Sequence, residues 1–127
     1  MRPLLLVLAA LALVHGGLLA VRPSGAESVA DAAGTGPTVG VVFDVGGRGD
    51  KSFNDGAWLG ADRARRELGA RVQFIEPGEG SDREAGLRLL AAEQRDVVFG
   101  VGFIFTDDLT ELAREYPGVP FAGVDYA

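Results

Sequence analysis

Short β-branched runs alternate with segments of helical period from Thr38 to Asp125, and this alternation constrains the fold more than any other feature of the chain. The expected strands are Thr38–Phe43, Arg71–Ile75, Asp96–Val101 and Pro120–Asp125. The expected helices are Phe53–Leu68, Asp82–Glu93 and Asp107–Glu115. Strands that alternate with helices form right-handed βαβ units around a mainly parallel sheet. The sequence therefore predicts an α/β lobe.

The same periodicity places apolar side chains along one side of the first two helices. In the first helix these are Phe53, Ala57, Trp58, Ala61, Ala64 and Leu68. In the second helix they are Ala85, Leu89 and Ala92, with Leu90 beside them. Polar residues that match N-terminal caps precede the three helices, namely Ser52 with Asp55, Ser81 with Glu84, and Thr106 ahead of two aspartates.

The N-terminal residues have the pattern of an export segment. Arg2 precedes an apolar run from Leu4 to Ala20, which is short for a membrane span. We expect residues 1–26 to be a signal peptide, cleaved near Ala26 or Ala20, with an uncleaved N-terminal anchor as the alternative. Residues 27–37 are small, polar and aperiodic, which is typical of a linker, and residues 38–127 are expected to form the lobe.

Composition argues against several classes of function. The formal net charge is −6, whereas nucleic-acid binding requires a basic surface. There is no cysteine, and His15 in the export segment is the only histidine. The lobe therefore lacks the commonest acid–base group, the thiol nucleophile and the preferred zinc ligands. We expect no enzymatic activity, no metal site and no cofactor.

Three loops should meet at one edge of the sheet, because ligands bind beyond the carboxyl ends of parallel strands. These loops are Asp44–Ser52, Glu76–Ser81 and Gly102–Thr106, and Asp125 ends the last strand. The sheet order is expected to place the first and third loops side by side.

The first loop offers groups that suit a nucleoside. Its glycines before Lys51 suggest a phosphate-binding loop, but that motif requires glycine where Asp50 stands, and Asp50 would repel phosphate. Asp44 could bind sugar hydroxyls, Phe53 could stack on a base, and Asn54 could read a base edge. As alternatives, Phe53 packs in the core and Asp44 caps a turn. Asp107 and Asp108 could likewise be ordinary acids of a first helical turn.

Two stretches resemble a known family. VGVVFDVGGRGDKSFNDGAWLGADRARRELG and VVFGVGFIFTDDLTELAREYPGVPFAGVD are similar to the basic membrane protein family of ABC-transporter substrate-binding proteins, the purine nucleoside receptor A type. The resemblance covers about Thr38 to Asp125. It implies an exported, two-lobed protein that closes on a nucleoside and delivers it to an ABC permease.

The resemblance also implies roles for individual residues. Asp44 resembles the carboxylate on the ribose side, Phe53 the aromatic on one face of the base, Asn54 the amide at the base edge, and Asp107 the acid facing the base, with Asp108 as its alternative. Supporting loop positions are Gly46, Gly47, Lys51, Ser52, Gly102 and Phe103.

Two features depart from the family. Val21 stands where many members have a lipid-bearing cysteine, so anchoring through cysteine is not expected. No second lobe follows, so we expect this sequence to be an N-terminal portion with half of a site. Other interpretations are a ligand-sensing or regulatory module of the same fold, or a non-functional truncated fragment.

Overall fold

The computed structural model describes residues 35–78 and 83–127, which form an α/β lobe around one parallel sheet. The elements in chain order are β1 (Thr38–Val42), α2 (Phe53–Leu68), β2 (Arg71–Ile75), α3 (Arg83–Ala92), β3 (Val97–Val101), the 3-10 helix η1 (Phe103–Phe105), α4 (Thr106–Glu115) and β4 (Phe121–Val124). Every strand and α-helix expected from the sequence is present, and no end differs by more than one residue. The expected export segment and most of the expected linker lie outside the described residues.

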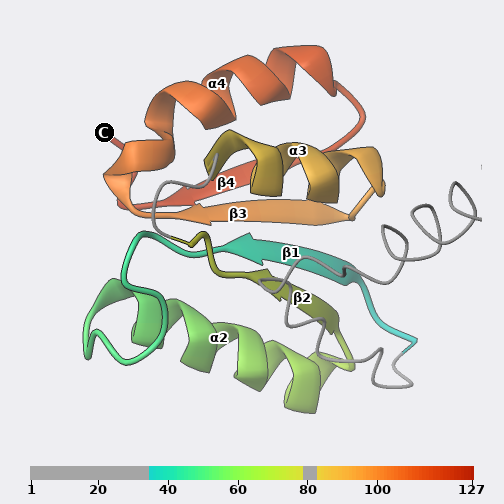
Figure 1. Ribbon diagram of the computed structural model, residues 1–127. Coiled ribbons are helices and arrows are strands. Elements are labelled where there is room, and N and C mark those ends of the chain that lie inside the picture. Colours follow the sequence, from blue (N-terminus) through green and yellow to red (C-terminus); the bar gives the residue numbers. More distant parts are fainter. Residues whose placement is uncertain (1–34, 79–82) are drawn as a thin grey trace, which may run out of the picture.

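The four strands are all parallel and lie in the order β2-β1-β3-β4. The chain moves outward from β1 to β2, and then crosses to the other side of β1 to form β3 and β4. Helix α2 covers one face of the sheet, and α3 and α4 cover the other (Figure 1). This order places a topological switch point between the carboxyl ends of β1 and β3, the position where open α/β sheets bind ligands.

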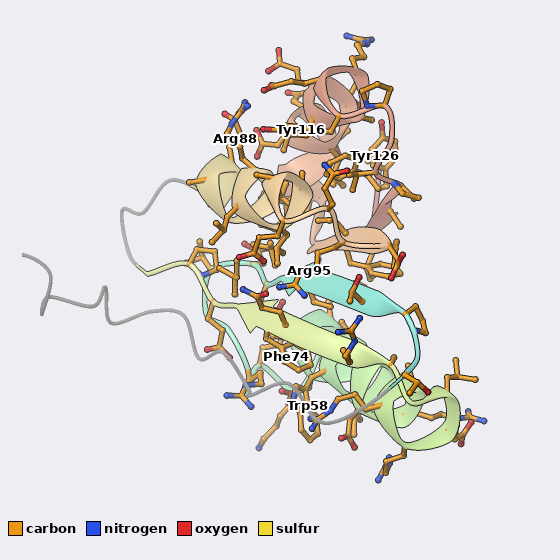
Figure 2. All side chains as sticks on the ribbon, turned by 90° about the vertical axis from the view of Figure 1, so that its right-hand side faces the viewer. Trp58, Phe74, Arg88, Arg95, Tyr116 and Tyr126 are labelled. Atoms are coloured by element: carbon orange, nitrogen blue, oxygen red, sulfur yellow. The ribbon has the colours of Figure 1, made fainter. Side chains whose placement is uncertain are left out.

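Alternation along the strands divides the core between the two faces. Val41 and Phe43 point toward α2, and the Phe43 ring stacks on Phe74 with centroids 5.5 Å apart. Trp58 is half-buried against this cluster, and Figure 2 shows Trp58 and Phe74 in the layer between α2 and β2. Val42 points the other way, into a larger cluster beneath α3 and α4. The apolar side chains that α2 directs at the sheet are Ala57, Trp58, Ala61 and Ala64, as expected.

Helix α2 leaves part of its face of the sheet open. An apolar groove of about 270 Å³ runs beside the helix and is lined by Val39, Val41, Ala57, Gly60, Ala61, Phe99, Val101 and Val124. Across residues 35–78 and 83–127, the structure contains no helix with the length and apolar character needed to cross a membrane.

The buried face of α3 differs from the expected one. Leu87, Leu90 and Ala91 are buried, whereas Leu89, Ala85 and Ala92 are exposed. The helix crosses above β1 to reach β3 and packs on both strands, and this path determines which side faces the sheet. At the two ends of α2, Phe53 and Leu68 lie in solvent, although both share the apolar spacing of the helix.

The expected side-chain caps are wrong at both described helix starts. Ser52 stands at the N-cap of α2 but makes no capping hydrogen bond through its hydroxyl. Thr106 is already helical, and its hydroxyl donates to the Phe103 carbonyl, 2.8 Å away, because η1 precedes α4 without a break. Ser81 lies outside the described residues.

Candidate functional site

The loops after β1 and β3 lie side by side at the switch point, which confirms the expected arrangement of the first and third loops. Asp44 follows β1 and Gly102 follows β3. A Cβ atom at Gly102 would lie 2.8 Å from the Asp44 Oδ2 atom, so the carboxylate rests directly against bare backbone. The Gly102 amide also donates to the Val124 carbonyl, 2.9 Å away. Gly102 therefore joins the ends of three strands at the candidate site.

Asn54 holds the first loop in shape. Its Oδ1 accepts the Asp44 amide at 3.2 Å, and its Nδ2 donates to the Gly47 carbonyl at 3.0 Å. The side chain is buried, with only 3% of its surface exposed. Each end of the amide thus already bonds to the loop, so Asn54 positions Asp44 in addition to any contact with a ligand. Its role at a base edge stays a prediction.

Two phenylalanines stand in solvent at this edge. Phe53 begins α2 and is 55% exposed, and Phe103 in η1 is 61% exposed. The interpretation of Phe53 as a core residue is therefore wrong. A ring that stands in solvent at this edge is free to stack on a planar ligand.

The acids after β3 differ in accessibility. Asp107 is exposed near the start of α4, and Asp108 is half-buried. Since α4 begins just beyond β3 and α2 just beyond the loop of β1, Asp107 and Phe53 both belong to the switch-point edge. Asp125 is exposed at the end of β4 on the same edge.

Asp50 is the helix cap that the sequence interpretation missed. Its Oδ1 accepts the amides of Ser52 and Asp55 at 2.8 and 3.1 Å, and its Oδ2 accepts the Asn54 amide at 3.0 Å. Hydrogen bonds from the amides of Ser52, Asn54 and Asp55, that of Ser52 foremost, lower the pKa of the Asp50 carboxyl against a smaller opposing effect of desolvation. The available signal was an aspartate shortly before a helix start, which is typical of a cap.

Two further acids stabilise the loop. Asp55 accepts the amides of Gly49 and Lys51 at 2.7 and 2.9 Å. Glu76, after β2, forms an ion pair with Arg48 at 2.7 Å. A Cβ atom at Gly47 would lie 2.7 Å from the same carboxylate, so the Glu76 side chain closely approaches the Gly47 backbone where the loops of β1 and β2 meet.

The remaining supporting positions serve the turn itself. Gly46 and Gly47 have φ of 108° and 57°, and Lys51 has φ of 52°, all in the region that favours glycine. Lys51 and Ser52 are exposed. In the described parts of the chain, no three His, Cys, Asp or Glu side chains are grouped as a metal ion would require. The edge thus offers aromatic faces and hydrogen-bond acceptors.

The contrast between Asn54 and Ser52 is testable by unfolding. We expect Asn54→Ala to lower the free energy of unfolding by about 1–3 kcal/mol, because it removes two hydrogen bonds and leaves the Gly47 carbonyl without its partner. Ser52→Ala should change it by less than about 0.5 kcal/mol, since the hydroxyl caps nothing. Urea unfolding of the two variants measures both values, and equal losses would contradict the assignment.

Comparison with known proteins matches the lobe to one family of substrate-binding proteins. A family model described as "ABC transporter substrate-binding protein PnrA-like" matches residues 38–126. An uncharacterized lipoprotein of Pyrococcus abyssi is 46% identical over 88 residues, which is 68% of this chain and 22% of the relative. One of Pyrococcus furiosus is 40% identical over 126 residues, which is 98% of this chain and 31% of the relative.

A solved structure agrees with these matches. The ABC transporter system solute-binding protein of Aeropyrum pernix K1 superimposes with a TM-score of 0.66 at 43% identity, covering 72% of this chain and 25% of that protein. The chain thus spans between a fifth and a third of the length of these proteins.

Proposed function

Because this chain belongs to the PnrA-like family of ABC transporter substrate-binding proteins, we propose that it supplies one wall of a nucleoside-binding cleft in an importer's receptor. The matching residues, 38–126, include all the elements around the switch point. The solved relative of Aeropyrum pernix is a solute-binding protein, and binding without chemical conversion is the activity we assign here.

One observation carries the assignment of a nucleoside. The exposed ring of Phe53 stands at the same sheet edge as the carboxylates of Asp44 and Asp107. A nucleoside has a planar base, which stacks on an aromatic ring, and a ribose, whose hydroxyls donate to carboxylates. In this proposal Phe53 covers one face of the base, Asp107 accepts from the base, and Asp44 accepts from the ribose.

The remaining parts of the proposal follow from the class of protein. The receptor acts outside the cytoplasm and hands its ligand to a membrane permease. The Pyrococcus relatives are named lipoproteins, and this sequence contains no cysteine. N-terminal sequencing of the protein from a cell-envelope fraction tests export.

Binding by this chain alone should be weak. Ligand pockets normally bury most of a ligand's surface, and a single wall leaves one face of the base in water. Association also costs at least about 4 kcal/mol of translational and rotational freedom. Saturation-transfer NMR detects weakly bound ligands and is therefore the suitable measurement. The ligands to compare are adenosine, guanosine, cytidine and adenine.

We expect Phe53→Ala to weaken every nucleoside to a similar degree, by about 1–3 kcal/mol of binding free energy, because stacking does not depend on base identity. The melting temperature should stay unchanged, since the ring is mostly exposed in the unliganded lobe. Unaltered saturation transfer to adenosine in Phe53→Ala would remove Phe53 from the site.

Removal of each of the two carboxylates should affect a different part of the ligand, the ribose for Asp44 and the base for Asp107. Asp44→Ala should weaken adenosine more than adenine, because its partner in the proposal is the ribose. Asp107→Ala should change the ranking of adenosine, guanosine and cytidine, because a hydrogen bond reads one particular edge. Glu111→Ala, an exposed acid on the same helix, serves as the control for loss of charge. Effects equal to this control would contradict both roles.

A further inference from the structure

The N-terminus of α2 lies where related architectures bind phosphate. In open α/β sheets, the glycine-rich loop after the first strand leads into a helix whose free amides hold an anion. Here β1, a loop with three glycines at positive φ, and α2 follow in the same order. The helix start also lies at the switch-point edge, beside the proposed nucleoside cleft.

The chain's own carboxylates occupy these amides. Asp50 accepts the amides of Ser52, Asn54 and Asp55, each within 3.1 Å. Asp55 takes the amides of Gly49 and Lys51 from the preceding loop. Five backbone donors that could face an anion are therefore already bonded to fixed negative charge.

Most of the surrounding charges act in the same direction, whereas the exposed Lys51 next to Asp50 is cationic and opposes them. Asp44, Asp107 and Asp125 follow strands at this edge, and the guanidinium of Arg48 is paired with Glu76. A phosphate group arriving here would face the Asp50 carboxylate with few free donors, and like charges at short range repel. An uncharged hydroxyl at the same place meets no such repulsion.

We propose that Asp50 is a specificity-determining residue, whose carboxylate fills the anion position at the start of α2 and so makes the cleft select nucleosides over their phosphate esters. The selection of nucleosides rests on the function proposed above. The exclusion of phosphate rests on the contacts of Asp50 and the acids around it and needs no bound nucleoside, so the two statements can fail separately.

The first test needs no nucleoside. Inorganic phosphate is titrated into the 15N-labelled chain while the amide signals of Ser52, Asn54 and Asp55 are followed. In the wild type these signals should not move. Asp50→Ser keeps a small capping hydroxyl, and in this variant the three signals should shift until phosphate saturates the site. The variant should bind phosphate at least about tenfold more tightly than the wild type does, because one charge-assisted hydrogen bond to phosphate contributes about that factor.

Two further variants separate position from charge. Asp50→Asn keeps the shape and an oxygen acceptor, and it should gain phosphate binding to a smaller extent than Asp50→Ser. Asp62→Asn removes the same charge from the same helix, away from its start, and should gain none. Thermal unfolding confirms that each variant is folded, and movement of the three wild-type signals would overturn the proposal even if neither Asp50 variant folds.

The second test compares adenosine with adenosine 5′-monophosphate by saturation transfer. The wild type should prefer adenosine at least about tenfold, and Asp50→Ser should reduce this ratio while Asp62→Asn keeps it. Phosphate shifting the three amides of the wild type, or an unchanged ratio in Asp50→Ser, would overturn the role of Asp50. If no variant binds adenosine or its monophosphate, the proposed function fails, and the phosphate titration still decides the inference.

Discussion

Replacing Phe105 with alanine is expected to lower the free energy of unfolding by about 3–5 kcal/mol, the range for removing a fully buried phenylalanine. The Phe105 side chain is 0% exposed and belongs to the larger core cluster, with Leu109 and Leu112 of α4. A Cβ atom at Gly100 would lie 2.9 Å from Phe105 Cβ, so the ring sits on strand backbone that has no side chain. Truncation would leave a cavity between β3 and α4.

Phe103 supplies the matched control within the same helical turn. It is 61% exposed, so Phe103→Ala should change the free energy of unfolding by less than about 0.5 kcal/mol. Small domains have only about 5–15 kcal/mol of stability, and Phe105→Ala should lower the melting temperature by more than about 10 °C. Urea and thermal unfolding measure both variants. Similar losses at the two positions would mean that η1 does not anchor α4 to the sheet.

This pair of phenylalanines also marks a limit of the sequence interpretation. Strands and α2 could be predicted, because five-residue β-branched runs and a sixteen-residue helix carry their periodicity plainly. The turn Phe103–Phe105 could not, because three residues of 3-10 helix are too short for a periodic signal. Gly102–Thr106 therefore reads as a plain loop, although Phe105 is one of the largest buried side chains.

Helix α3 was present as predicted, but its buried face was not the expected one. Six of its ten residues are alanine or leucine, so several faces of the helix are apolar. The buried face depends on where the helix crosses the sheet, and that path requires the strand order β2-β1-β3-β4. Alternation of strands and helices predicted a parallel sheet with the loops after β1 and β3 side by side, but it did not predict the path of α3 across the sheet.

The carboxyl edge could be predicted, since every parallel strand ends there, but its hydrogen bonds could not. Whether Asp50 faces solvent or its own helix depends on the turn made by Gly46, Gly47 and Gly49, each at positive φ. The sequence interpretation considered only the repulsion between Asp50 and phosphate, whereas the contacts of Asp50 with Ser52, Asn54 and Asp55 make it a helix cap. The ligand contacts of Asp44, Phe53, Asn54 and Asp107 stay predictions.

Gly102→Ala is expected to lower the free energy of unfolding by about 2–6 kcal/mol, from two separate causes. Gly102 has φ of 112° and ψ of 146°, a backbone region almost restricted to glycine, and an alanine there costs about 1–3 kcal/mol. The added Cβ would also lie 2.8 Å from the Asp44 Oδ2 atom, and overpacking of this kind costs a further 1–3 kcal/mol, roughly.

Gly46→Ala separates these causes, because Gly46 has a similar φ of 108° but a Cβ there would meet nothing within 4 Å. This control should show backbone strain alone, and the additional loss in Gly102→Ala then measures the contact with Asp44. Since the alanine displaces the Asp44 carboxylate, Gly102→Ala should also weaken adenosine more than adenine in the saturation-transfer experiment. Urea unfolding measures the stability of both variants, and saturation transfer measures their binding of adenosine and adenine. Equal stabilities and equal ligand ratios would show that Asp44 moves aside freely, and Gly102 would then hold no part of the cleft in place.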